Sequence, residues 1–178
     1  MKRNLILWQT IGVIFTLVFG IILHYSFSWS GNNIIVACIS SVNESVWEHM
    51  KLIFFPTFFF AFIESKFVAF KYQSYWCVKS IGIILGITLI PVLYYTLNGA
   101  FGPLRDIFNI IIFVVVSFAV YYLETFLFKS GIVICKRKDK AIVMLFIIAL
   151  TFVVLTFVPP SFDIFKDPMS GSYGYNWI

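Results

Sequence analysis

The segment Ser41-Val-Asn-Glu-Ser-Val-Trp-Glu-His-Met-Lys51 leads directly into an apolar run with the composition of a membrane-spanning helix. It holds two of the chain's eight acidic residues and one of its two histidines. Charged side chains lose their hydration near lipid, so membrane proteins keep them mainly where something binds or reacts beside them. The segment therefore predicts a membrane fold and the position of its functional site.

The overall composition supports the membrane assignment. Of 178 residues, 61% are apolar and 12% are charged, and the mean hydropathy is +0.95. Soluble domains contain about 45–50% apolar and about 25% charged residues. The short alternating strands of a membrane β-barrel are missing from the pattern. We predict an all-α, polytopic membrane helix bundle that forms a single domain over residues 1–178.

Five apolar runs approach the length of about 20 residues that a bilayer-spanning helix needs. The first run exceeds the 7–15 apolar residues of a signal peptide and no small-residue cleavage site follows, so we expect it to be a retained span. The apolar run 34–39 is too short to cross and should lie in the outer interface or between helices. The expected spans are 5–27, 50–70, 78–97, 105–128 and 140–158, followed by an outer tail over 159–178.

Basic residues predict the orientation of these spans. With the N-terminus inside, ten of the thirteen lysines and arginines lie on the inner side, and Lys51, Arg105 and Lys166 lie outside. This positive-inside bias places the N-terminus inside and the C-terminus outside. It also accounts for the net charge of +5, so no nucleic-acid partner is expected.

The same topology gathers polar residues at the outer ends of the spans. Ser41 and Glu44 have capping-box spacing, which predicts a helix that begins at Ser41. At about 100° per residue, Glu44, Glu48 and Lys51 then share one face, and His49 lies about 100° from Glu48. A purely structural interpretation is also open: Glu44 as a cap, Glu48 and Lys51 as an ion pair, and His49 as an interfacial side chain.

These residues include donors suited to a divalent metal ion, which needs nitrogen and oxygen ligands from several elements. Catalytic roles are expected for Glu44, Glu48 and Lys51, with a glutamate as ligand or general base. Substrate binding is expected for Asn43 and for Arg105, which would hold an anionic headgroup together with Lys51. The expected metal ligands are His24, Glu48, His49, Asp163 and Asp167.

The C-terminal tail combines turn residues with large apolar ones. Prolines and the pairs Asp-Pro and Ser-Gly indicate turns, whereas Phe162, Phe165 and Tyr173 would be missing from a free polar tail. We expect the tail to fold back and bring Asp163 and Asp167 to the mouth of the bundle. The alternative is an interfacial anchor that uses its aromatic side chains.

Other signals concern packing and cysteine chemistry. Gly82 and Gly86 form a small-xxx-small pair that lets another helix approach closely, and Pro56 and Pro91 should bend their helices. Cys38 is expected outside, and the other two cysteines near the inner surface, so no disulfide crosses the membrane. Acylation of Cys77 is conceivable.

Two stretches resemble a known family. Asn43-Glu-Ser-Val-Trp-Glu-His-Met-Lys51 and Phe165-Lys-Asp-Pro-Met-Ser-Gly-Ser-Tyr-Gly174 are similar to a family of small bacterial integral membrane proteins known as a domain of unknown function. The resemblance covers nearly the whole chain. It implies a multi-pass protein of the bacterial cytoplasmic membrane and supplies no activity or catalytic residue.

Three functions remain open from the sequence. The first is a metal-assisted hydrolase or transferase that acts on a membrane lipid or lipid-linked substrate. The second is a small-solute or proton/cation carrier, in which Glu64 and Glu124 join the outer residues as a path and homo-oligomers are needed. The third is a non-catalytic protein that binds a membrane protein partner. A haem held by His24 and His49 is a further alternative.

Overall fold

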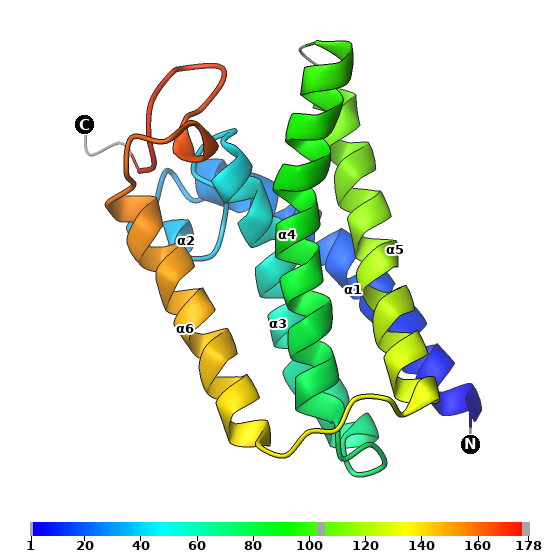
Figure 1. The fold of residues 1–178 in the computed structure, drawn as a ribbon. Helices are drawn as coiled ribbons and strands as arrows, with labels where there is room; N and C mark the ends of the chain where they lie inside the picture. Colours follow the sequence, from blue (N-terminus) through cyan, green and yellow to red (C-terminus); the bar gives the residue numbers. More distant parts are fainter. Residues whose placement is uncertain (1, 103–105, 176–178) are drawn as a thin grey trace.

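The computed structural model describes residues 2–102 and 106–175, and these residues form a bundle of long helices (Figure 1). Each long helix begins and ends within four residues of one of the five spans expected from the sequence. A four-residue helix α2 (Ile34–Ala37) and a 3-10 helix η1 (Asp163–Phe165) lie in the connections. The long helices are α1 (Lys2–Trp29), α3 (Val46–Val68), α4 (Tyr75–Phe101), α5 (Asp106–Ser130) and α6 (Lys138–Phe157).

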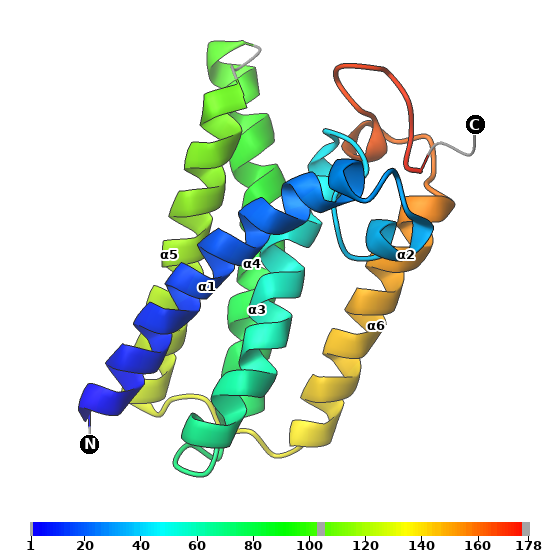
Figure 2. The same ribbon diagram turned by 180° about the vertical axis from the view of Figure 1, so that it is seen from behind.

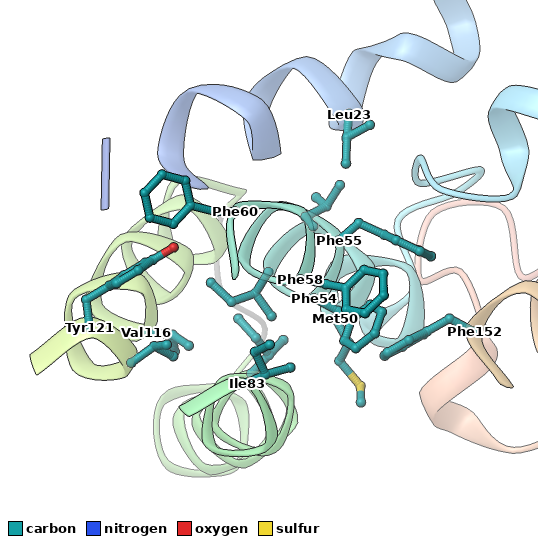
Figure 3. Close-up of a cluster of buried hydrophobic side chains, with 14 of the residues drawn as sticks. Leu23, Met50, Phe54, Phe55, Phe58, Phe60, Ile83, Val116, Tyr121 and Phe152 are labelled. Atoms are coloured by element: carbon teal, nitrogen blue, oxygen red, sulfur yellow. The ribbon is translucent and has the colours of Figure 1, made fainter. Parts of the chain in front are cut away.

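Helix α3 lies at the centre of the bundle. Fifteen of its 23 residues are buried, and it packs against α1, α4 and α6. Figure 3 shows the α3 side chains Phe54, Phe58 and Phe60 among residues that the other long helices contribute. Six of the eighteen buried residues in this core are aromatic, and each buried ring removes a large apolar area from solvent.

Within the described residues, four helices are long and apolar enough to cross a membrane: Asn4–Trp29, Tyr75–Phe101, Ile107–Ser130 and Lys138–Phe157. The expected fifth span, α3, is not one of them. Its ends carry the charged residues Glu48, Lys51, Glu64 and Lys66, and the other helices surround it. The structure therefore supports a helical membrane fold with four candidate spans.

Small residues allow the helices to approach closely, as expected for Gly86. A Cβ atom added there would lie 2.9 Å from Val120 of α5 and 3.3 Å from Ile53 of α3. Helix α1 also crosses α3 closely, because a Cβ at Gly20 would lie 3.0 Å from the carbonyl oxygen of Leu52. That carbonyl has no helical partner, since Pro56 four residues later lacks an N–H.

The connections divide between the two ends of the bundle. The N-terminus, the α3–α4 turn and the α5–α6 loop lie at one end, and the segment 30–45 and the tail lie at the other (Figures 1 and 2). The tail folds back onto the start of α3, as expected. Phe165 is buried with its ring centroid 4.7 Å from that of Trp47, and Asn43 Nδ2 donates to the carbonyl of Gly174 at 3.2 Å.

A disulfide joins Cys77 at the start of α4 to Cys135 in the α5–α6 loop. The pairing removes the thiol that acylation of Cys77 would require. It lies at the end where lysines predict the inner side, whereas disulfides are rare in reducing cytosol. Lys79 and Lys51 are also fully buried, so neither counts toward the charge bias across the membrane. Nine lysines and arginines then lie on the expected inner side and two on the expected outer side.

We predict that Gly86→Ala lowers the stability of the bundle by about 1–3 kcal/mol, because the added methyl group overpacks the contact with Val120. Gly99 on the same helix is the matched control, since no atom lies within 4 Å of an added Cβ there. Gly99→Ala should leave stability unchanged or raise it. Thermal unfolding in detergent measures both, and an equal effect at the two positions would contradict the packing argument.

Candidate functional site

The site begins where α3 begins. The prediction of a helix start at Ser41 is wrong: Ser45 is the N-cap, and its hydroxyl oxygen accepts from the backbone N–H of Glu48 at 3.3 Å. The capping spacing of Ser41 and Glu44 repeats in Ser45 and Glu48, and the second pair is the one in use. Glu44 therefore precedes the helix, with its side chain 47% exposed.

His24, Glu44 and His49 form a group that we call the His–Glu–His cluster. One ligand atom from each residue lies within 4.8 Å of the others. Glu44 Oε1 is 3.8 Å from His24 Nε2, and Glu44 Oε2 is 3.5 Å from His49 Nε2. Two ligands bound at about 2.0–2.1 Å to one ion are at most about 4.2 Å apart. Both glutamate–histidine distances meet this condition through different oxygens of Glu44, whereas the 4.8 Å limit of the whole group exceeds it.

Hydrogen bonds orient the two imidazoles. His49 Nδ1 lies 2.9 Å from the carbonyl oxygen of Ser45, and a carbonyl only accepts, so Nδ1 carries the proton in this contact. Nε2 is then free to present its lone pair toward Glu44. His24 Nδ1 lies 3.2 Å from the hydroxyl of Ser41. Histidines that ligate metals are held in this way by their second nitrogen.

The three residues of the cluster come from two separate stretches of the chain. His24 is in the last turns of α1, Glu44 is in the segment before α3, and His49 is in the first turn of α3. A lone pair on Nε2 that faces a carboxylate is favourable only with a cation between them, either a proton or a metal ion. The cluster can hold either one.

The structure places Glu48 and Lys51 in a separate, buried network. Lys51 Nζ donates to Glu48 Oε2 at 2.8 Å, to the carbonyl of Ala37 at 2.9 Å and to Thr156 Oγ1 at 2.9 Å. Glu48 also accepts from the N–H of Val42 at 3.0 Å. Since both side chains are at most 1% exposed, they connect α3 to α6 and do not line the cluster.

The remaining expected site residues also lie elsewhere. Asp163 is exposed, and Asp167 is buried in its own turn, where it accepts from the N–H of Met169 at 2.7 Å and the hydroxyl of Ser170 at 2.8 Å. Asn43 is occupied by Ser45 N–H at 2.9 Å and by its bond to the tail. Arg105 lies outside the described residues.

One cavity lies beside the cluster. It has a volume of about 30 Å³, between α3, α4 and α5, and His49, Tyr94 and Asn109 are its polar lining residues. This volume suits a water molecule and is too small for a lipid headgroup. A larger ligand would reach the cluster from the exposed side of Glu44.

At the other end of the bundle, the sequence analysis singled out Glu64 and Glu124 but missed that Lys79 joins them in one polar group. Lys79 Nζ, placed at the inner surface from the sequence, lies 3.0 Å from Glu64 Oε2 and 2.6 Å from Glu124 Oε2. All three side chains are fully buried. The available signal was that Glu64, Lys79 and Glu124 each lie near the same end of an apolar helix.

We predict that Lys51→Met lowers the free energy of unfolding by about 3–5 kcal/mol, because Glu48 is left as a buried, uncompensated carboxylate. The double variant Glu48→Gln/Lys51→Met should recover much of this loss. Lys166→Met, on the exposed tail, should stay within about 0.5 kcal/mol of the parent protein. Chemical unfolding in detergent measures the cycle, and additive single effects would show that the pair does not interact.

Comparison with known proteins identifies a family but no activity. No curated protein and no solved structure matches the chain. A family model covers residues 1–175, which is nearly the full length. The chain therefore belongs to the family of unknown function DUF6512.

Proposed function

We propose that the protein is a membrane-embedded, metal-dependent hydrolase or transferase that acts on a lipid or lipid-linked substrate. The observation that carries this proposal is the convergence of His24, Glu44 and His49 within 4.8 Å of one another. Three protein ligands leave coordination positions open, which is the arrangement of catalytic rather than structural sites. Two imidazoles and one carboxylate suit zinc and other divalent transition metals.

The cluster also has the access that catalysis requires. His24 and His49 side chains are 27% and 18% exposed, and Glu44 is 47% exposed. A divalent ion bound there would polarise a substrate oxygen and activate water. The site lies at one end of four apolar helices, which is where lipid headgroups would lie if these helices span a membrane. The partner in this proposal is therefore a membrane lipid.

This assignment replaces the broader ligand set expected from the sequence. Glu44 becomes a ligand, whereas Glu48 and Asp167 have their oxygens occupied by other donors. Lys51 cannot hold an anionic headgroup from its buried position, since three acceptors already surround its ammonium group. The general base is then left to water or to a group on the substrate.

We expect the purified protein to bind Zn²⁺, and Glu44→Gln, His24→Ala and His49→Ala each to weaken binding by more than about 100-fold, since loss of an outer partner alone costs 10–100-fold. Asp163→Asn is the matched control and should bind as the parent does. Calorimetric titration with Zn²⁺ measures this. Unchanged binding in Glu44→Gln would remove the site.

The activity is tested separately on the same variants. Incubation with a total bacterial lipid extract and Zn²⁺, read by mass spectrometry, should give a product that the parent and Asp163→Asn form and His49→Ala does not. Zinc binding without any metal-dependent product would retain the metal site and overturn the enzymatic assignment.

We further propose that the cluster faces the outside of a bacterial cytoplasmic membrane, with the N-terminus inside, on the basis of the lysine and arginine bias. In a variant without native cysteines, an impermeant maleimide should label Met169→Cys in intact cells and Phe70→Cys only after permeabilisation. Both positions are highly exposed, at 78% and 83%, and lie at opposite ends of the bundle. The reverse labelling pattern would place the N-terminus outside. The Cys77–Cys135 disulfide favours that orientation, because disulfides are rare on the cytosolic side.

A further inference from the structure

The buried polar group around Lys79 contains a carboxylate oxygen without a hydrogen-bond partner and more negative than positive groups, which points to a bound ligand. We define the Lys79 cluster as Glu64 of α3, Lys79 of α4 and Glu124 of α5, with Gln9 of α1 and Tyr75 of α4 against it. Glu64, Lys79 and Glu124 are fully buried, and Gln9 and Tyr75 are 4% and 1% exposed. Four of the five long helices thus contribute to one enclosed polar site.

The two carboxylates of the cluster accept different numbers of hydrogen bonds and ion pairs. Glu64 accepts from Gln9 Nε2 at 2.8 Å, from the Tyr75 hydroxyl at 3.0 Å and from Lys79 Nζ at 3.0 Å. Glu124 accepts from Lys79 through Oε2 alone, at 2.6 Å. Its Oε1 is buried without a hydrogen-bond partner. A buried carboxylate oxygen in that state costs several kilocalories per mole unless it is neutralised.

The balance of charges in the cluster also indicates that one carboxylate must be neutralised. Both described ion pairs of these carboxylates end on the single ammonium of Lys79, so two negative groups share one positive group. The other polar groups described against the cluster are neutral: the amide of Gln9 and the hydroxyls of Tyr75 and Tyr121, the last of which lies 2.8 Å from Thr16 Oγ1. The fully ionised cluster would carry a net charge of −1 inside an apolar bundle, where unpaired charge is strongly disfavoured.

We propose that the Lys79 cluster is a proton-binding site, with the proton on Oε1 of Glu124. This proton neutralises the excess charge and turns the unpartnered oxygen into a donor. A candidate acceptor lies in the same cluster, because Gln9 Oε1 is likewise buried without a hydrogen-bond partner. Glu64 stays ionised, since three donors already stabilise its charge. Carboxyl groups that exchange protons inside membrane bundles are the elements of proton relays.

The proton site is separate from the metal site. Gln9 and His24 are fifteen residues apart on α1, which is about 22 Å along the helix. No residue is shared between the two groups. Loss of one site therefore leaves the other testable, and failure of the metal proposal would not affect this one.

Infrared difference spectroscopy of protein in lipid tests the proposal through the carbonyl band of a protonated carboxyl group. At neutral pH the parent should show a band equivalent to one buried carboxyl. Glu124→Gln and Glu64→Gln should each abolish it, because either change restores charge balance with Lys79. Asp139→Asn, which removes an exposed carboxylate at the start of α6, should retain it. A band that persists in Glu124→Gln would overturn the assignment.

Two further measurements keep the test decisive if a variant fails to fold. Lys79→Met should double the band, since both carboxyl groups then need protons. In the parent protein, raising the pH should reduce the band and the unfolding temperature together. The native state then holds one proton more than the unfolded state, so its stability falls with rising pH, by up to tenfold in the unfolding constant per pH unit. Stabilisation by Na⁺ at fixed pH that Glu124→Gln abolishes would instead assign the site to a metal cation.

Discussion

A helix with three buried charged side chains lies in the middle of an apolar bundle, and the rest of the structure follows from pairing those charges. Glu48 and Lys51 near one end of α3 are satisfied by each other, by Thr156 of α6 and by backbone groups of the segment before α3. Glu64 near the other end is satisfied by α1 and α4. Each unpaired group would cost several kilocalories per mole in this environment. The polar contacts therefore fix how α3 is rotated among its neighbours.

The two polar ends of α3 differ in accessibility, and this difference separates their chemistry. At the end with the tail, the connection before α3 is irregular, so Glu44 stays outside the helix and meets the two imidazoles near the surface. At the other end the Lys79 cluster is enclosed by helices and aromatic rings, with Lys79 Nζ 4.9 Å from the ring centroid of Tyr121. An exposed group suits a ligand delivered from outside. An enclosed group suits only the smallest of ligands.

The helical fold could be predicted closely from the sequence, because runs of apolar residues with charged flanks leave few alternatives for a membrane helix. The site was predicted in part. The motif identified Glu44 and His49, and polarity alone added His24. Wheel geometry failed because it assumed that Glu44 belonged to the helix, whereas Ser45 ends the irregular segment. Asp167 was misplaced because sequence cannot show that its own turn satisfies both oxygens. Lys79 was missed because hydropathy does not reveal which helix faces meet.

The disulfide between Cys77 and Cys135 links the start of α4 to the loop that leads into α6, across 58 residues of sequence. A crosslink of that span restricts the unfolded chain and, in the chain-entropy treatment, stabilises the fold by about 4 kcal/mol. That is a sizeable share of the 5–15 kcal/mol that holds a typical domain together. The redox state on that side of the bilayer thus sets the stability of the fold, and a reducing environment would deliver a protein that unfolds more readily.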